Sequence, residues 1–326
     1  ILIVCSASAV DRHQVAYRGQ LIDIVDRNGE AVWQGDIVLG RTADLLAATQ
    51  KFVPGVPDLA DKSLGLGVST NRWPRGSSGL FEMPYTIEND PNGVVPAAVD
   101  SFNQQLAGFF RAVPRTSETD YVAFNLDSTD TTASCFSSIG RVTGRQQISG
   151  ARNCGTGTLV HEMGHAIGLW HEQQRSDYGR WVTINLDAVD PEFASNYTQN
   201  ANQRDLGLYD FGSIMHYGFS GFSRVGGVTL ETIPPGISIG VRGGYSPGDL
   251  DGIRRLYGTY SSAVIVDSLP SGLTVIVDGA NQELHELPIT DTGAELIPFT
   301  DWAPHVDEIA RVYVRFMQRA MEAAPA

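Results

Sequence analysis

Residues 161–172 of this chain read His-Glu-Met-Gly-His-Ala-Ile-Gly-Leu-Trp-His-Glu. His161 and His165 are four residues apart, so on a helix their side chains share one face and can bind one metal ion. Zinc favours imidazole nitrogens in a tetrahedral shell. Glu162 follows the first of these histidines and can reach a metal-bound water as a general base. The pattern therefore predicts a zinc-binding helix over residues 158–169.

A third ligand six residues after His165 cannot lie on the same straight helix face. Gly168 resolves this, because glycine adopts positive φ, ends a helix and turns the chain back, which brings His171 to the same ion. Three protein ligands leave one position open for water, as in a catalytic zinc site. The alternative is a set of ordinary surface histidines on an amphipathic helix. The joint spacing of three His, one Glu and one Gly makes that coincidence rare.

A second motif, Ser213-Ile214-Met215-His216-Tyr217, lies downstream. Alone, a turn that contains Met more often belongs to a core than to a site. After the long zinc motif, it resembles the Met-turn of the metzincin zinc proteases. The resemblance implies that Met215 forms an apolar floor beneath the zinc and that Tyr217 points its phenol at the metal.

Within the metzincins, the chain resembles the astacin family of zinc endopeptidases. Two features carry this resemblance: Glu172 directly after the third His, and the Ser-x-Met-His-Tyr form of the turn. Other segments similar to the family are residues 84–87, 135–141 with Cys154, 181–185 and 246–257. The resemblance implies an α+β metzincin fold, in which a twisted mixed sheet and an active-site helix build two lobes around a cleft. A short pro-region and a small β-rich C-terminal extension would flank it.

The pro-region also resembles that of astacins, because Trp33-Gln34-Gly35-Asp36-Ile37 is similar to their Phe-x-Gly-Asp motif, with Trp in place of Phe. The resemblance implies that the Asp36 carboxylate binds the zinc and displaces the water in a zymogen, and Gly35 lets the backbone approach closely. A plain surface turn is the alternative for Gly35-Asp36. A thiolate switch through Cys5 is a competing one.

The resemblance further implies that the new amino terminus of the mature enzyme is buried near Glu172. Otherwise Glu172 is a solvated charge at the helix exit. The chain has three cysteines, and Cys135 and Cys154 lie 19 residues apart. An exported protein would oxidise these two to a disulfide, and the alternative is two buried thiols. The family's second disulfide has no counterpart here.

We expect four regions along the chain. Residues 1–9 resemble the end of a signal peptide, or else a short buried strand. Residues 10–62 are the propeptide, which ends in a Pro- and Gly-containing linker suited to an activating cut. Residues 63–258 are the catalytic domain. Trp73 stands near the expected mature start, but its spacing to Pro84 is longer than is usual in the family, so we expect that start near residues 55–70. Residues 259–326 are a C-terminal extension with a β-rich start and a helical tail.

Local patterns predict helices over residues 95–112, 158–169 and 247–257. They predict strands over residues 84–87, 121–124, 263–266 and 273–277, with a hairpin at Asp278-Gly279.

Acidic residues outnumber basic ones by 37 to 23, which gives a net charge of −14 and argues against a nucleic-acid partner. No apolar run approaches the roughly 20 residues of a transmembrane helix. We expect a secreted monomer, and a weak lipoprotein-like pattern over residues 2–5 leaves association with the cell envelope open. Its partners would be protein or peptide substrates and an activating protease.

The sequence thus predicts a zinc endopeptidase, made as a zymogen, with one Zn²⁺ per chain. Glu162 would act as base and Tyr217 would stabilise the oxyanion, while substrate lies extended along residues 135–141. One alternative is an inactive binding module, and another is a different metzincin branch. Arg224 and Arg242 would each select acidic substrate side chains or be plain surface charges.

Overall fold

The computed structural model describes residues 11–17, 20–50, 72–128, 134–197, 205–224, 226–257, 264–268, 273–278 and 283–288. The chain divides into two compact units, residues 1–250 and 251–326. Several predictions fall outside the described residues: the signal-peptide remnant with Cys5, the linker and mature amino terminus between residues 51 and 70, Gly279 of the predicted hairpin, and the helical tail.

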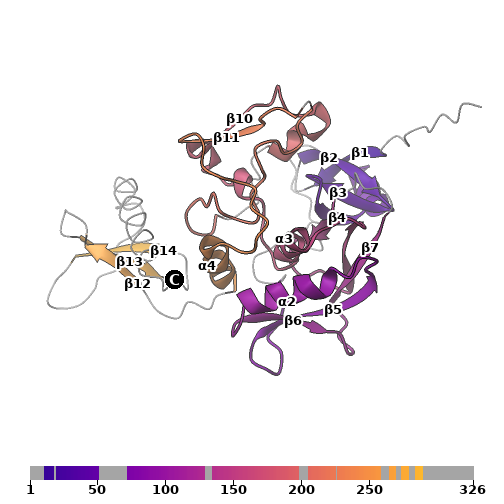
Figure 1. Cartoon of the computed structure of the whole chain (residues 1–326), viewed down its shortest axis with the longest axis horizontal. Helices are drawn as coiled ribbons and strands as arrows, with labels where there is room; N and C mark the ends of the chain where they lie inside the picture. The colour runs from indigo at the N-terminus through magenta and orange to yellow at the C-terminus, as the bar shows by residue number, and fades with distance from the viewer. Residues whose placement is uncertain are drawn as a thin grey trace, which may run out of the picture. The chain divides into compact units, whose positions relative to one another are not determined.

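A mixed sheet of nine strands organises the described part of the first unit, in the spatial order β1-β2-β3-β4-β8-β9-β7-β5-β6 (Figure 1). Strands β6, β5, β7 and β9 pair in parallel, whereas β8 pairs antiparallel with β9. The strand bounds are β1 Arg12–Tyr17, β2 Gln20–Arg27, β3 Glu30–Trp33, β4 Ile37–Arg41, β5 Phe81–Asn89, β6 Phe110–Pro114, β7 Tyr121–Ser128, β8 Phe136–Ser138 and β9 Arg145–Ala151.

Residues 11–50, which belong to the predicted propeptide and are called the pro-region below, fold into more structure than their sequence predicts. Strands β1 to β4 form an antiparallel meander, and helix α1 (Thr42–Thr49) follows it. Asn28 and Gly29 turn the chain between β2 and β3 with positive φ, and Asp26 Oδ1 accepts the Gly29 N–H at 2.8 Å. Alternate side chains such as Val15 and Ile24 point into a core that Leu45 of α1 covers.

The pro-region joins the rest of the sheet through one pairing. Strand β4 lies parallel to β8, with Ile37 opposite Ser137 and Val38 opposite Ser138. The backbone N–H of Ser137 also donates to the carbonyl of Asp36 at 2.7 Å. The edge that β8 would otherwise present is therefore covered by β4.

Helices α2 (Val95–Gln105) and α3 (Thr156–Ala166) pack against each other beside the sheet (Figure 1). Asp90 stabilises the start of α2, because its carboxylate accepts the N–H groups of Val94 and Val95 at 3.0 and 2.9 Å. The prediction of a helix over residues 95–112 is wrong at its end. Gly108 adopts a φ of 75°, and β6 begins at Phe110 because Phe110 and Ala112 bury alternate side chains.

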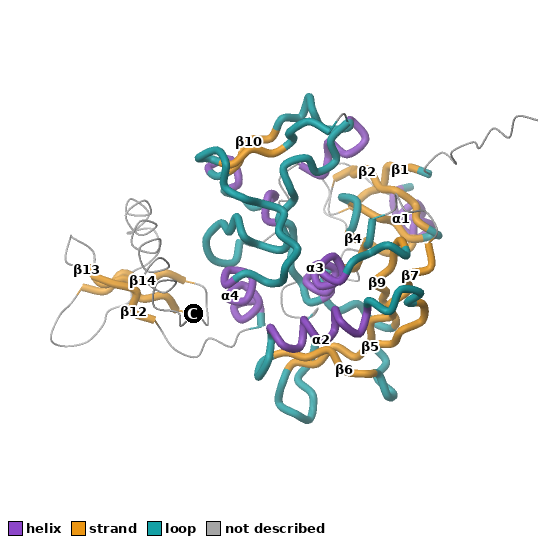
Figure 2. The backbone as a smooth tube through the Cα atoms, in the orientation of Figure 1, coloured by secondary structure: helices purple, strands orange, loops and turns teal. Residues whose placement is uncertain are grey.

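The remainder of the first unit is mostly loop and turn (Figure 2). It contains the short helices η2 (Glu172–Gln174), η3 (Tyr178–Arg180) and η4 (Pro191–Tyr197), and the antiparallel pair β10 (Val182–Ile184) and β11 (Leu230–Thr232). Aromatic side chains, including Tyr197, Tyr209 and Tyr217, give this part its own core. A disulfide joins Cys135, just before β8, to Cys154, just before α3.

Helix α4 (Pro247–Leu256) crosses from the first unit into the second. In the second unit, β12 (Val264–Ser268), β13 (Leu273–Asp278) and β14 (Glu283–Pro288) form an antiparallel sheet. These strands lie where the sequence predicts a β-rich segment. Among the described helices, none combines the length and the apolar character that a membrane span needs.

The start of α3 packs directly on the backbone of residue 242. A Cβ on Gly157 would lie 2.0 Å from the carbonyl oxygen of Arg242, closer than any real contact. We therefore expect Gly157→Ala to destabilise the protein by about 1–3 kcal/mol, even though alanine favours a helix over glycine. Thermal unfolding of the full chain measures this. Gly179→Ala is the control, because its Cβ would meet nothing within 4 Å. An unchanged melting temperature for Gly157→Ala would contradict the packing described.

Candidate active site

Three histidine rings meet at the end of α3. His161 and His165 project from one face of the helix, with ring centroids 4.7 Å apart. The helix ends at Ala166, and Gly168 adopts a φ of 113°, so the chain turns back as its sequence predicts. His171 then lies with its ring centroid 4.8 Å from that of His165 and 5.6 Å from that of His161. The three rings are at most 2% exposed.

Backbone carbonyls fix which nitrogen of each ring faces the centre. Nδ1 of His161 lies 2.8 Å from the carbonyl of Ile214, and Nδ1 of His165 lies 2.8 Å from that of Leu169. A carbonyl only accepts, so both Nδ1 atoms carry the hydrogen and both Nε2 atoms keep a lone pair. Burial lowers the pKa of both histidines, which favours this neutral form.

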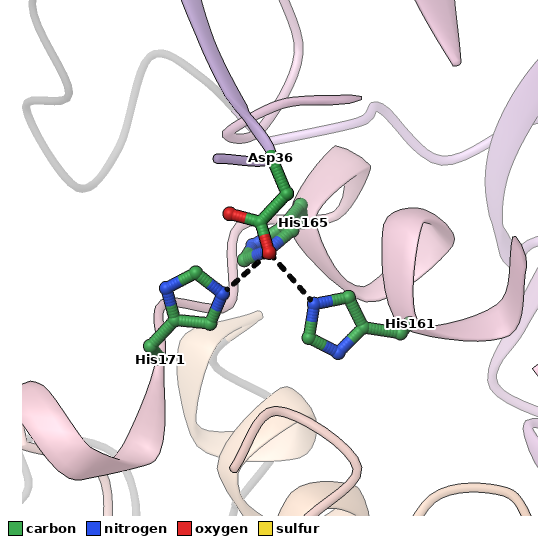
Figure 3. A group of neighbouring side chains, drawn as sticks. All are labelled: Asp36, His161, His165 and His171. Atoms are coloured by element: carbon green, nitrogen blue, oxygen red, sulfur yellow. Dashed lines mark hydrogen bonds and ion pairs between the residues drawn. The ribbon is translucent and has the colours of Figure 1, made fainter. Parts of the chain in front are cut away.

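Asp36 of the pro-region is the fourth member of the group (Figure 3). Its Oδ2 lies 3.0 Å from Nε2 of His171, 3.5 Å from Nε2 of His161 and 4.0 Å from Nε2 of His165. The approach depends on Gly35, whose φ is 87° and whose Cβ, if present, would lie 2.6 Å from the ring of Phe222. A side chain at residue 35 would push Asp36 away from the histidines.

The four ligand atoms fit a divalent cation. They lie within 4.8 Å of one another. Nε2 of His161, Nε2 of His165 and Oδ1 of Asp36 are buried and have no hydrogen-bond partner among the described residues. Lone pairs that converge on a carboxylate repel each other unless a positive charge lies between them. Imidazole nitrogen and carboxylate oxygen are the donor set of zinc.

Glu162 stands beside this group without binding to it. Its side chain is 1% exposed, and its Oε2 has no hydrogen-bond partner among the described residues. Burial first, and then the negative charge of Asp36, raises the pKa of Glu162 well above its usual range. A buried carboxyl group that holds its proton more tightly than usual is typical of an acid–base residue.

The Met-turn lies directly under α3. Met215 is 1% exposed, and a Cβ on Gly164 would lie 2.8 Å from its sulfur, so the helix and the turn pack without a gap. Asp249 of α4 holds the turn in shape. Its carboxylate accepts Ser213 Oγ–H at 2.6 Å and the N–H of Ile214 at 2.9 Å.

The phenol of Tyr217 is hydrogen-bonded to the pro-region in this structure. Its hydroxyl donates to the carbonyl of Gln34 at 2.8 Å, and its ring lies 4.6 Å from that of His171. Gln34 also places its Oε1 3.4 Å from Nδ1 of His171. The pro-region therefore occupies both the centre of the histidine group and the one phenol predicted to serve it.

Glu172 is mostly buried, with 14% of its side chain exposed, and it is paired. Its Oε1 accepts the N–H of Asp210 at 2.8 Å and lies 3.5 Å from Nε of Arg175. Burial raises the pKa of Glu172 to about 8. Glu172 is therefore not a solvated charge at the helix exit, as the alternative prediction had it.

A cavity of about 420 Å³ opens beside Glu162. It is lined by residues that include Asp36, Cys135, Thr158, Glu162, Tyr217 and Arg242. Arg242 enters this cavity and donates from Nη1 to the carbonyls of Ile214 and His216 at 2.8 and 3.0 Å. Arg224 lies elsewhere, exposed, with Nη2 donating to the carbonyl of Asp187. Of the two arginines singled out in the sequence, only Arg242 lines the cavity.

Two residues that position the site carry no signal of their own in the sequence. Gln34 contacts Tyr217 and His171, but it stands at the variable position of its motif. Asp249 orders the Met-turn from 35 or more residues away, and no spacing rule links the two segments.

Comparisons with known proteins agree with this geometry. The family model Astacin, which describes a family of peptidases, matches residues 67–258. The astacin-like metalloendopeptidase of Mus musculus is 31% identical over 222 residues, which cover 66% of this chain and 49% of that protein. High choriolytic enzyme 1 of Oryzias latipes is 35% identical over 193 residues, 57% of this chain and 69% of that protein. The chain thus spans about half the length of the mouse relative.

The solved structure of high choriolytic enzyme 1, a hatching enzyme zinc-protease from medaka, matches with a TM-score of 0.52 and 34% identity. The match covers 58% of this chain and 95% of that one. Fold and site together define the class, which is that of the metzincin zinc endopeptidases. The chain belongs to the astacin family of peptidases. The predicted α+β metzincin fold and the zinc cofactor are confirmed.

The zinc content of single variants should distinguish the three histidines of the site from the other histidines of the chain. We expect the full chain to bind one zinc, and His161→Gln, His165→Gln or His171→Gln to weaken zinc binding by about a hundredfold or more, because each removes one buried donor. Elemental analysis after dialysis against a competing chelator measures this. His13→Gln in β1 is the matched control and should retain zinc. Full zinc retention by any of the three variants would exclude that histidine as a ligand.

Proposed function

We propose that this chain is a secreted zinc endopeptidase, made as a zymogen in which Asp36 blocks the metal. One observation supports this above all. The Asp36 carboxylate comes from the pro-region yet lies within 3.0–4.0 Å of Nε2 of all three histidines. The intact histidine set with Glu162 beside it also counts against the inactive binding module. The region limits 1–9, 10–62, 63–258 and 259–326 are part of this proposal.

His161, His165 and His171 would hold the zinc of the mature enzyme. When bound, zinc lowers the pKa of a coordinated water toward about 7 and polarises a carbonyl. The hydrogen bonds to Ile214 and Leu169 keep two of the rings in the required tautomer and orientation. Met215 fills the space beneath them and excludes water from that side.

Glu162 is proposed as the general base and acid. Its carboxylate lines the cavity next to the metal site, where it can accept the proton of the attacking water and then deliver it to the leaving amine. The cavity beside Glu162 leaves room for the substrate at this carboxylate. Proton transfer by a positioned side chain contributes about 10²–10⁴-fold to a rate.

Tyr217 is proposed to serve the reaction once the pro-region has left. Loss of Gln34 frees its hydroxyl, which can then turn toward the metal at rest or donate to the oxyanion in the transition state. Substrate would pair with the edge of β8 that β4 covers in the zymogen.

Activation would be a cut by another protease after the pro-region. Removal of residues 11–50 would withdraw Asp36 from the histidines and β4 from β8 in one step. The partly buried carboxylate of Glu172 is proposed to receive the new amino terminus, since an ammonium group would pair with it there. The Cys135–Cys154 disulfide supports export to an oxidising compartment, and we propose that the enzyme works as a monomer.

Acidic substrate side chains are the proposed occupants of the Arg242 cavity. Nη1 of the guanidinium donates to three backbone carbonyls, of Ile214, His216 and Val241, which fixes the charge in place at the cavity wall. Arg224 is not proposed for this role.

Glu162→Ala tests the base. We expect the matured variant to keep its zinc but to lose hydrolysis of casein by about a hundredfold or more, because no other carboxylate of the catalytic region lines the cavity among the described residues. Zinc content and casein cleavage are measured on the same sample. Near-normal cleavage by Glu162→Ala would refute the role of Glu162.

Asp36→Ala tests the switch. We expect the uncut variant to cleave casein at least tenfold faster than the uncut parent, because the carboxylate no longer lies on the metal site. Asp23→Ala, at an exposed position of β2, is the matched control and should stay latent. If uncut Asp36→Ala is as silent as uncut parent, another feature maintains latency.

A further inference from the structure

The core of the pro-region is completed by two side chains from the catalytic region. Among its described members, all lie within residues 11–50 except Ile139 and Trp170. Trp33 is the contact between the two sets. Its ring lies 6.1 Å from that of Trp170 in an edge-on arrangement and 5.8 Å from that of Tyr17. Trp33 and Ile139 are each 5% exposed and Trp170 is partly buried, so little of this cluster reaches water.

This contact lies beside the metal site. Trp170 directly precedes His171, and Ile139 follows the last residue of β8. The N–H of Gly140 donates to the carbonyl of His165 at 2.8 Å, which ties the chain after Ile139 to the end of α3. The pair Ile139 and Trp170, called the apolar patch below, is therefore anchored to two elements that carry zinc-binding histidines.

The apolar patch and the Arg242 cavity lie at opposite ends of β8. Cys135 precedes the strand and lines the cavity, whereas Ile139 follows the strand. Side chains along β8 alternate between two faces. Phe136 packs against Val32 and Val38 on one face, and Ile139 packs with the Trp33 cluster on the other. An extended chain on β8 would thus meet a cation at one end and apolar side chains at the other.

We propose that Ile139 and Trp170 form a substrate subsite of the mature enzyme, which takes one large apolar side chain, above all an aromatic one, of an extended polypeptide. Trp33 occupies this subsite in the zymogen. The inference rests on the proposed function, because the patch opens only when the pro-region leaves. The subsite would select substrate residues on one side of the cleaved bond, whereas Arg242 would select those on the other side.

The occupant follows from the geometry of the zymogen. Trp33 precedes Asp36 by three residues, and Asp36 stands where the reacting centre of a substrate must come. Trp33 pairs with Ile37 across the turn of residues 34–36, so it stands beside the strand that begins directly after Asp36. An extended substrate advances about 3.3 Å per residue and could bring a side chain two to four residues from the cleaved bond to the same place. Uncovered apolar side chains next to a cleft mark a binding surface for apolar groups.

The test is a position scan with the full chain, cut at a protease site engineered into residues 51–66 and freed of its pro-region. Peptides carry either Trp or Ala at one position within about four residues of the cleaved bond. We expect Trp to raise kcat/KM by about tenfold at one position on one side of the bond. Ile139→Ala and Trp170→Ala should each reduce that ratio to within about threefold of unity.

Two controls separate the subsite from general damage. Val142→Ala changes an exposed side chain close to Ile139 and should leave the Trp-to-Ala ratio unchanged. Arg242→Gln should change preferences on the other side of the cleaved bond only. Because each variant is judged by a ratio between two peptides, a loss of zinc or of folded protein cancels.

The peptide scan distinguishes failure of the subsite from failure of the proposed function. Cleavage of the Ala peptides without a preference for Trp at any position overturns the subsite and leaves the proposed function standing. A preference that survives in the double variant of Ile139 and Trp170 also overturns it. Failure to cleave any peptide overturns the proposed function and the subsite together.

Discussion

Three imidazole lone pairs that face one buried point constrain the rest of this protein. Two of them are fixed by backbone carbonyls, of Ile214 and Leu169, which come from the Met-turn and from the turn after α3. Such an arrangement is unfavourable without a cation, so folding and metal binding are coupled. The glycines at 157, 164 and 168 follow from this constraint, since they let α3 pack on residue 242, pack on Met215 and end early enough for His171 to return.

The pro-region is built around the same group of three histidines. It supplies a carboxylate to the metal site, a carbonyl to Tyr217 and a strand to β8, which are the three positions that a water, an oxyanion donor and a substrate strand would use in the proposed mechanism. Its own four strands and helix hold these groups in register. A short flexible peptide would have to lose much conformational entropy to do so, whereas a folded pro-region has lost it already.

The zinc site was the most predictable part of the chain, because its ligands lie within 11 consecutive residues and their spacing follows from helix geometry and one glycine. The α+β class followed from the resemblance. Contacts between distant segments were predictable only where a motif carried them, as for Asp36 and the histidines. Nothing local tells that Asp249 orders Ser213 or that Arg242, and not Arg224, lines the cavity. The end of α2 was missed because apolar spacing in Phe110 and Ala112 fits both a helix and a strand.

The pro-region holds the catalytic region largely through its main chain. The carbonyls of Gln34 and Asp36 accept from Tyr217 and Ser137, and β4 pairs with β8 through backbone groups. Main-chain recognition is indifferent to most amino-acid replacements. Nearly every pro-region side chain that neither fills its core nor touches the metal site could therefore change without loss of these main-chain contacts, and a related pro-region would need little more than a glycine followed by an acid to place its backbone and carboxylate in the same way.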